Sequence, residues 1–334
     1  MIGVFCVDIG YSLKRESKKW EQNVRSYPGQ ALYGVNHFRE FEIEPIFECC
    51  EHDYFYGKWY AFIDEFIKLA SIIKSYKKID LIYFPHAYYS RWIVFLKRFN
   101  ILKKPIVACL HNKNNLFGFI KSCDYVFTIN PTLCKKLKEQ YPDACIEYIP
   151  LLPESRIKLQ DKGVYRYDVI SIGNTKRDYQ TLIEAMRGLE YRCLIVTDLK
   201  MQNIPENVTI IHEHVAYENC LELYASSRII AIPIQENAEE GVFGLTSLID
   251  AISVERPIIV TKTKGLGIPI ADEGLGLEVE IGNSQQMQNA ILQLLRDKEE
   301  WDRYRDSLRK YRLDHNMESS TKKMCQIFRE IVKK

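Results

Sequence analysis

Residues 244–252 read Gly-Leu-Thr-Ser-Leu-Ile-Asp-Ala-Ile, and residues 256–261 read Arg-Pro-Ile-Ile-Val-Thr. The glycine and the two hydroxyl residues open an apolar run that is typical of a helix, and the proline leads into a β-branched strand. Because the first N–H groups of a helix have no partner inside it, small residues there create a site for an anion. Asp250, six residues after Gly244, could bond sugar hydroxyls. Phosphate and ribose together predict a nucleotide site.

Length and composition set the frame for this site. At 334 residues, 46% hydrophobic and 27% charged, the chain suits a globular protein of two domains, each of about 150 residues. Residues 1–150 carry 21 Lys and Arg against 16 Asp and Glu, whereas the remainder carries 25 against 28. The basic clusters of the first half are Lys14, Arg15, Lys18, Lys19, Lys77, Lys78, Lys97, Arg98, Lys103 and Lys104. Such clusters are usually solvated, but interleaved with Tyr, Trp and Phe they could also rest on anionic lipid. The modest charge disfavours nucleic-acid binding.

The cysteines and the N-terminus bear on the cellular compartment. Ten cysteines form no C-x-x-C pair and no metal-ligand spacing, and a bond between the adjacent Cys49 and Cys50 would be strained. We therefore expect thiols in a reducing cytoplasm. The first eight residues lack the basic region of a secretory signal, and no apolar run approaches about 18 residues, so we expect neither export nor a membrane span.

Short β-branched or aromatic runs alternate with helical patterns along the chain. The predicted strands are residues 3–7, 79–84, 105–110, 125–129, 168–172, 192–196, 208–211, 229–233 and 257–260. Asn130-Pro131-Thr132 predicts a helix start, proline-flanked residues 149–154 predict a linker, and the tail from about residue 283 is helical. Alternation of strands and helices implies parallel sheets with right-handed crossovers.

We therefore predict an α/β chain of two Rossmann-like, doubly wound domains that face each other across a cleft. The first domain spans residues 1–153 and the second spans residues 154–311. A C-terminal helix of about residues 312–334 would pack back on the first domain.

Polar residues follow several predicted strands, at the edge where parallel sheets bind ligands. Gly173 follows the strand of residues 168–172, and Lys176 and Arg177 come shortly after it. Breaking a sugar–phosphate bond builds negative charge on the departing phosphate, which these two cations could neutralise. Basic loop residues are more often merely solvated, but the second glycine site at Gly244 favours the phosphate interpretation.

Histidines also follow predicted strands. His111 ends the strand of residues 105–110, where a structural and a catalytic role are equally plausible, and His86 ranks below it. His212 and His214 form an H-x-H pair, but spacing places no third ligand, so we do not expect a metal. The chain also lacks G-x-S-x-G, Walker A and H-E-x-x-H motifs, and G-x-G-x-x-G after the first strand, which disfavours hydrolases, NTPases, zinc proteases and NAD enzymes.

The second half of the chain resembles the donor domain of glycosyltransferase family 4, whose members are retaining transferases of the GT-B fold. The segments that resemble the donor domain are residues 171–185, 205–233 and 244–261, whereas residues 124–130 and 148–150 resemble the strand and linker that end the family's acceptor domain. The resemblance covers most of residues 105–300 and is specific in the C-terminal half. In the first 100 residues it rests only on the Pro28-Gly29-Gln30 loop.

The resemblance implies roles for the matching positions. It implies three catalytic residues. Arg177 aligns with the family's phosphate-binding lysine, Lys176 takes the role of its arginine, and His111 aligns with the histidine that contacts the donor sugar. The residues that it implies in nucleotide-sugar binding are Gly173, Asn174, Gly244, Leu245, Thr246, Ser247 and Asp250. Residues 244–247 would give backbone N–H groups to the diphosphate, and Asp250 would bond the ribose.

The chain also departs from the family pattern. Val242 occupies the position of the first glutamate of the E-x7-E motif, and Glu239 and Glu240 are out of register. Asn174 replaces the usual arginine after the glycine, and Leu151-Leu152 replaces a common Asn-Gly. Many members lack the first acid, so transferase activity is still implied.

The implied function is a metal-independent, retaining hexosyltransferase that takes a nucleotide-diphosphate sugar, with UDP favoured over GDP. The acceptor would be a glycan or lipid-linked precursor in bacterial-type surface polysaccharide assembly. The donor is a co-substrate, and no resident cofactor is expected. We expect a cytoplasmic protein that meets the inner face of the cell membrane through its basic N-terminal half. Two alternatives remain open: a nucleotide-sugar 2-epimerase of the same fold, and a non-catalytic partner subunit.

Overall fold

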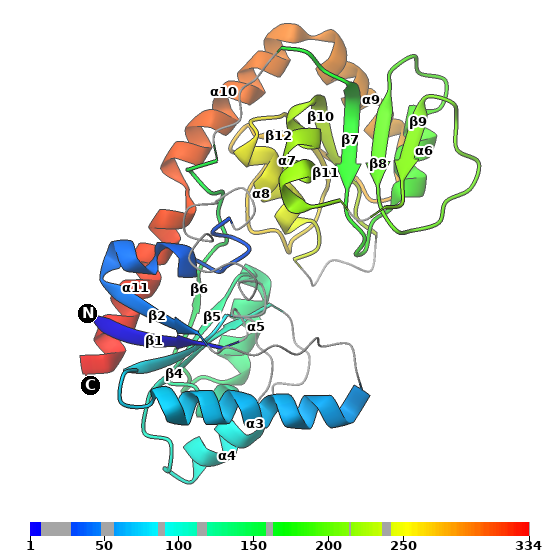
Figure 1. The fold of residues 1–334 in the computed structure, drawn as a ribbon. Helices are drawn as coiled ribbons and strands as arrows, with labels where there is room; N and C mark the ends of the chain where they lie inside the picture. The colour runs from blue at the N-terminus through cyan, green and yellow to red at the C-terminus, as the bar shows by residue number, and fades with distance from the viewer. Residues whose placement is uncertain are drawn as a thin grey trace. The chain divides into compact units, whose positions relative to one another are not determined.

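The computed structural model describes residues 1–7, 28–47, 57–85, 91–111, 119–157, 163–213, 215–235 and 242–333, with the backbone alone at residues 57–65 and 91. The chain divides into two compact units. Unit 1 comprises Met1–Leu151 and Met317–Lys334, and unit 2 comprises Leu152–Asn316. Each unit is built on a six-stranded sheet in which all pairs of strands are parallel (Figure 1). The predicted α/β class with two Rossmann-like sheets is confirmed.

The sheet of unit 1 has the order β2-β1-β3-β4-β5-β6. Its strands are β1 (Ile2–Cys6), β2 (Ile43–Phe47), β3 (Leu81–Phe84), β4 (Ile106–Leu110), β5 (Tyr125–Thr128) and β6 (Ile146–Tyr148). Strands β3 and β4 are buried along their whole length, as expected for inner strands covered on both faces. The four strands predicted here are confirmed to within two residues. The two edge strands, β2 and β6, were not predicted.

Helices and short 3-10 turns flank this sheet. They are η1 (Val35–Phe41), α3 (Gly57–Ser75), α4 (Arg91–Arg98), η2 (Ile120–Ser122), α5 (Pro131–Gln140) and α11 (Met317–Lys333). The predicted start of α5 is confirmed: the Asn130 side chain accepts a hydrogen bond from the Leu133 N–H at 3.1 Å, and Pro131 occupies the first helical position. The C-terminal helix α11 is part of unit 1, where the Phe328 ring lies 5.6 Å from that of Phe38 and 5.4 Å from that of Tyr83.

The sheet of unit 2 has the order β12-β11-β10-β7-β8-β9. Its strands are β7 (Tyr167–Ile172), β8 (Cys193–Val196), β9 (Val208–Ile211), β10 (Ser227–Ile232), β11 (Ile258–Thr261) and β12 (Gly276–Val279). The five predicted strands are confirmed, and only the edge strand β12 was missed. The chain runs outward from β7 to β9 and returns to the other side of β7 at β10. In such sheets the ligand site lies at this reversal, beyond the carboxyl ends of the two strands.

The helices of unit 2 cover both faces of its sheet. They are α6 (Tyr179–Met186), α7 (Tyr217–Ala225), α8 (Leu245–Ser253), α9 (Ser284–Arg296) and α10 (Lys298–Asp314). Helices α6 and α9 share one apolar cluster with alternate strand residues such as Val169, Ile195 and Ala231. Helices α7 and α8 contact each other and the strands β7 and β10. Helix α8 therefore begins beside the strand reversal.

Candidate functional site

The candidate site of unit 2 begins at Gly173, the residue directly after β7. Its backbone has φ +143°, in a region that side-chain-bearing residues rarely adopt. The Gly173 N–H donates to the Val196 carbonyl at 3.1 Å, and the Tyr179 hydroxyl donates to the Gly173 carbonyl at 2.7 Å. Hydrogen bonds thus connect the loop after β7 to the strand β8 and to the first residue of the helix α6.

Arg177 is held in this loop from both sides of its backbone. It forms an isolated antiparallel bridge with Ile234, and the Gln235 side chain donates to the Arg177 carbonyl at 3.1 Å. The guanidinium is buried, and its Nη2 donates to the Ser247 hydroxyl of α8 at 2.7 Å and to the Ile172 carbonyl at 3.4 Å. The loop after β7 and the first turn of α8 are therefore joined by one cation.

Two glycines make room for this guanidinium. A Cβ at Gly173 would lie 2.8 Å from Nε and Nη2 of Arg177, and a Cβ at Gly244 would lie 2.9 Å from Nη1. Gly244 also has φ +90°, a conformation that favours glycine. The guanidinium therefore lies against both glycines, and we call this arrangement the glycine cradle of Arg177.

The cradle leaves part of the cation without partners. Nε and Nη1 of Arg177 are buried and have no hydrogen-bond partner in the part of the chain that the structure describes. A buried charged donor without an acceptor costs free energy, and an anion placed against it would remove that cost. The arrangement is chemically ready for a phosphate or diphosphate.

The first turn of α8 adds backbone donors to the same place. Gly244 is the N-cap, and no side chain of the described residues caps the helix. The Leu245 N–H already donates to the Val242 carbonyl at 3.1 Å, and the Leu245 side chain is buried in the core. Among the described residues no backbone partner is found for the N–H groups of Thr246 and Ser247. Of the helix-start N–H groups expected at the diphosphate, the structure thus leaves those of Thr246 and Ser247 for an anion, while that of Leu245 is engaged.

Asp250 lies on the same side of α8 as Ser247, three residues further on. Its side chain is buried, and Oδ1 accepts a hydrogen bond from the hydroxyl of Tyr217, the first residue of α7. Burial and the adjacent Asp250 charge raise the pKa of Tyr217 well above its usual value, so the hydroxyl stays protonated and donates. Tyr217 thus orients the carboxylate that was expected at the ribose.

The remaining expected positions have different surroundings. The Asn174 amide donates to Asp198 at 2.7 Å, and its oxygen accepts from the Thr197 hydroxyl at 2.9 Å, so its side chain ties the loop to the end of β8. Lys176 is half-buried with φ +53°, and it forms no ion pair among the described residues. Glu239 and Glu240, near the replaced acid at Val242, lie outside the described residues.

In unit 1, His111 follows β4 and has both ring nitrogens engaged. Nε2 lies 3.2 Å from the Pro85 carbonyl, to which it donates, and Nδ1 lies 3.3 Å from the Tyr33 hydroxyl. The His111 and Tyr33 rings are 4.8 Å apart. A sugar hydroxyl that bonds to His111 would therefore have to compete with Pro85 or Tyr33 for a ring nitrogen. His86 and residues 112–115 are outside the described residues.

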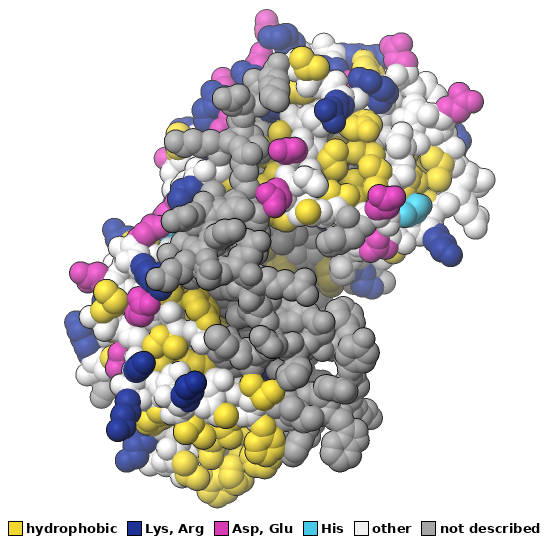
Figure 2. All heavy atoms as spheres, in the orientation of Figure 1, with side chains coloured by type: hydrophobic (Ala, Val, Ile, Leu, Met, Phe, Trp, Pro, Cys, Tyr) yellow, Lys and Arg dark blue, Asp and Glu magenta, His cyan; other side chains and the backbone are white. Residues whose placement is uncertain are grey.

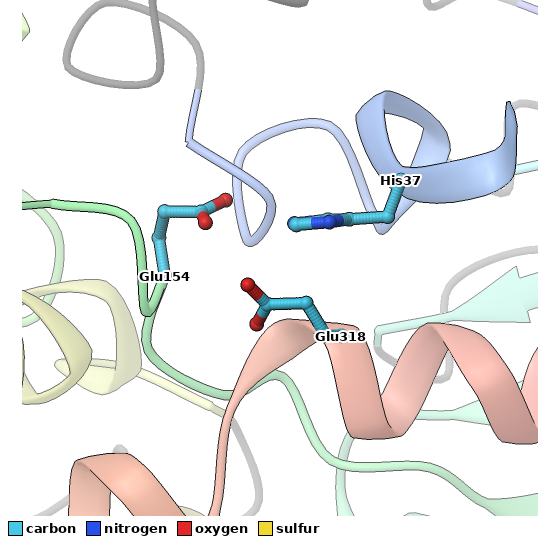
Figure 3. A group of neighbouring side chains, drawn as sticks. All are labelled: His37, Glu154 and Glu318. Carbon is cyan, nitrogen blue, oxygen red and sulfur yellow. The ribbon is translucent and has the colours of Figure 1, made fainter. Parts of the chain in front are cut away.

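The other histidines and acids are placed as follows. His212 donates through Nδ1 to the Thr197 carbonyl at 2.9 Å, while His214 is outside the described residues. His37 lies on η1 and Glu318 in the first turn of α11, both in unit 1 (Figure 3). Glu154, also drawn there, belongs to unit 2, where it pairs with Arg156 at 2.8 Å. His37 Nδ1 lies 3.1 Å from Glu40 Oε1, so His37 and Glu154 each have a partner in their own unit.

Two functional candidates were not foreseen from the sequence, Tyr179 and Tyr217. Both stand at the first position of a helix, Tyr179 buried and Tyr217 half-buried, so a sequence pattern does not mark either as a site residue. Burial raises the pKa of Tyr179, so its hydroxyl also stays a donor. Their partners, Gly173 and Asp250, become neighbours only through the fold.

Comparisons with known proteins show which family model and which solved structures this chain resembles. Residues 166–297 match the family described as Glycosyl transferases group 1, which places the cradle and Asp250 inside the matched segment. No curated protein sequence matches the chain.

Solved structures match over nearly the whole chain. A glycosyltransferase from Rickettsia africae is 14% identical with a TM-score of 0.67, and the match covers 99% of both chains. Sucrose-phosphate synthase from Thermosynechococcus elongatus is 14% identical with a TM-score of 0.69, again over 99% of both chains. HepE from Anabaena, solved with UDP-glucose, is 12% identical with a TM-score of 0.63, over 99% of this chain and 100% of that one. At these identities the likeness establishes the fold.

Proposed function

We propose that this protein is a retaining family 4 glycosyltransferase with a nucleotide-diphosphate sugar as donor, since residues 166–297 match the glycosyl transferases group 1 family and the chain has the GT-B fold. The observation that carries the proposal is the glycine cradle of Arg177. Among the described residues, two nitrogens of this buried cation have no partner and the start of α8 has no side-chain cap, and this arrangement is suited to a diphosphate leaving group.

The chemistry follows from that placement. The bond between the anomeric carbon and the diphosphate oxygen breaks, and charge develops on the diphosphate. Arg177, the N–H groups of Thr246 and Ser247, and Lys176 stabilise that charge. The acceptor hydroxyl bonds to the anomeric carbon on the same face, and its proton passes to the departing diphosphate. No metal and no protein nucleophile is required in this scheme.

The other site residues bind and orient the donor. Asp250, held by Tyr217, accepts hydrogen bonds from the ribose hydroxyls, and Asn174 keeps the loop after β7 in place. His111 supports the positive charge that develops on the sugar. We favour UDP as the nucleotide, since HepE of the same fold was solved with UDP-glucose. The transferred group is a hexose in this proposal.

The acceptor that we propose is a glycan or a lipid-linked precursor of a surface polysaccharide, met at the cytoplasmic face of the membrane. The basic N-terminal half supports this location. Among the described residues, no helix has the length and apolar character that crossing a membrane requires.

A thermal-shift screen of the purified full chain against UDP, GDP, ADP and their sugars tests the donor assignment. A ligand that binds only the folded state raises the melting temperature, so we expect the largest shift with UDP compounds. No shift with any of these nucleotides would overturn the proposal. Product analysis with the donor alone distinguishes an epimerase, which forms an epimer, and donor hydrolysis or transfer would exclude a non-catalytic subunit.

A further inference from the structure

Unit 1 exposes a group of large apolar side chains on α3, on α4 and just after α4. Five of them are 45% to 64% exposed, although such residues usually lie in a core. Together with the half-buried Trp92, this group is called the aromatic face: Phe66, Ile73, Trp92, Phe95, Phe99 and Ile101.

The aromatic face is continuous. The ring of Trp92 lies 5.5 Å from that of Phe66 and 6.3 Å from that of Phe95, and the rings of Phe95 and Phe99 are 4.5 Å apart. Ile73 follows Phe66 by two helical turns and lies on the same side of α3. Figure 2 shows apolar side chains gathered over this part of unit 1, with Lys and Arg side chains beside them. Contiguous exposed apolar surface of this kind marks an interaction site.

The charged residues of the segment that carries the aromatic face are mostly positive. Residues 66–105 contain nine Lys and Arg but a single acidic residue, Asp80, which accepts a hydrogen bond from the Gly3 N–H at 2.9 Å. The exposed members are called the basic rim: Lys74, Lys77, Lys78, Arg98 and Lys103. Lys97 is paired with Asp124 at 2.8 Å and contributes little.

The aromatic face and the basic rim together indicate what kind of partner binds this surface. Aromatic and aliphatic side chains gain free energy when they enter the boundary between lipid headgroups and acyl chains, and each nearby cation gains more from anionic headgroups. We propose that the aromatic face and the basic rim dock unit 1 on an anionic lipid bilayer. This surface specifies the membrane contact of the proposed function, but lipid binding can be measured without any transfer reaction.

Vesicle flotation of the full chain tests the proposal. We expect the protein to float with vesicles of phosphatidylcholine and phosphatidylglycerol, and to stay behind with phosphatidylcholine alone. The variant Lys74→Gln/Lys77→Gln/Arg98→Gln should lose about fivefold in partitioning for each charge removed, hence about 100-fold in all. The variant Phe95→Ser/Phe99→Ser should no longer float.

A matched control separates this surface from exposed apolar residues in general. Val164 and Leu313, in unit 2, are 76% and 64% exposed, so Val164→Ser/Leu313→Ser should float like the wild type. An unchanged UDP thermal shift in each variant shows that unit 2 is folded. A change in lipid binding can then be interpreted independently of the donor assignment. The proposal is overturned if the Lys74→Gln/Lys77→Gln/Arg98→Gln and Phe95→Ser/Phe99→Ser variants float as well as the wild type. It is also overturned if the wild type binds neutral vesicles as well as anionic ones. Loss of a stable dimer in the Phe95→Ser/Phe99→Ser variant, without vesicle binding by the wild type, would assign the face to a second copy instead.

Discussion

Unit 1 and unit 2 each contain a six-stranded parallel sheet, but the polar residues after their inner strands β4 and β7 differ in how fully they are hydrogen-bonded. After β4, both ring nitrogens of His111 have partners inside unit 1. After β7, the buried Arg177 keeps Nε and Nη1 without a partner among the described residues. A saturated group is stable without a ligand, whereas an unsaturated buried cation is costly until an anion arrives. Both residues follow a strand, so their position does not show which one is prepared for a ligand. The number of unpartnered nitrogens among the described residues does.

The units also differ in where they carry positive charge. The basic rim of unit 1 is exposed and lies on or just after the same two helices as the exposed apolar side chains, which suits an extended anionic surface. The Arg177 cation of unit 2 is enclosed by Gly173 and Gly244, which suits a single small anion. The following substitutions test this contrast.

The largest expected effect belongs to Arg177→Ala. Removing the cation from the leaving group should lower the turnover number by about 100- to 1000-fold with the fold intact, measured by initial rates of sugar transfer. Arg192→Ala, which removes an exposed arginine from the same unit, should leave the rate unchanged. Unchanged kinetics in Arg177→Ala would remove the phosphate assignment.

His111→Ala should have a smaller effect, because His111 contributes one hydrogen bond and already has partners in its own unit. We expect turnover to fall by about 10- to 100-fold while the dissociation constant for UDP stays the same. Steady-state kinetics and calorimetry on one preparation check both values. A weakened UDP affinity would contradict the separation of the two roles.

Asp250→Asn should weaken UDP binding by about tenfold or more, because a charge-assisted hydrogen bond to the ribose is lost. Tyr217→Phe should weaken it only about two- to tenfold, since the carboxylate remains and loses its orientation. Calorimetry with UDP and with an analogue lacking both ribose hydroxyls checks the assignment. If either variant weakens the analogue as much as UDP, the ribose assignment is wrong.

The smallest effects concern the stability of the cradle. Gly244→Ala should cost about 1–3 kcal/mol of unfolding free energy, because φ is +90° and the new Cβ meets Arg177, Ile232 and Ile234. Gly188→Ala is the control: its φ is +76°, but nothing lies within 4 Å of the new Cβ, so about 1 kcal/mol is expected. Urea denaturation measures both, and equal losses would show that the cradle is not crowded.

The sequence predicts the inner strands best. β3 and β4 are buried along their whole length and β10 at five of its six positions, and their apolar runs are visible without a structure. The edge strands β2, β6 and β12 were missed because each is only partly buried and a glutamate interrupts its apolar run.

For the site, glycines at strand and helix ends indicated where a ligand approaches. The sequence could not show that Gly173 and Gly244, 71 positions apart, enclose one guanidinium, or that Tyr217 reaches Asp250 from another helix. Those neighbours are created by the packing of α7 and α8 against the sheet. The engaged N–H of Leu245 likewise depends on the local turn at Val242.

We propose that Arg177 is kept buried for a ligand and not for the fold, and thermal melting of Arg177→Met with and without UDP distinguishes the two roles. Replacing an incompletely paired buried cation by an apolar side chain of similar length should leave the melting temperature of the free protein equal or higher. The increase that UDP produces in the wild type should disappear. A lower melting temperature together with a retained UDP shift would contradict the account, because it would make Arg177 a structural residue.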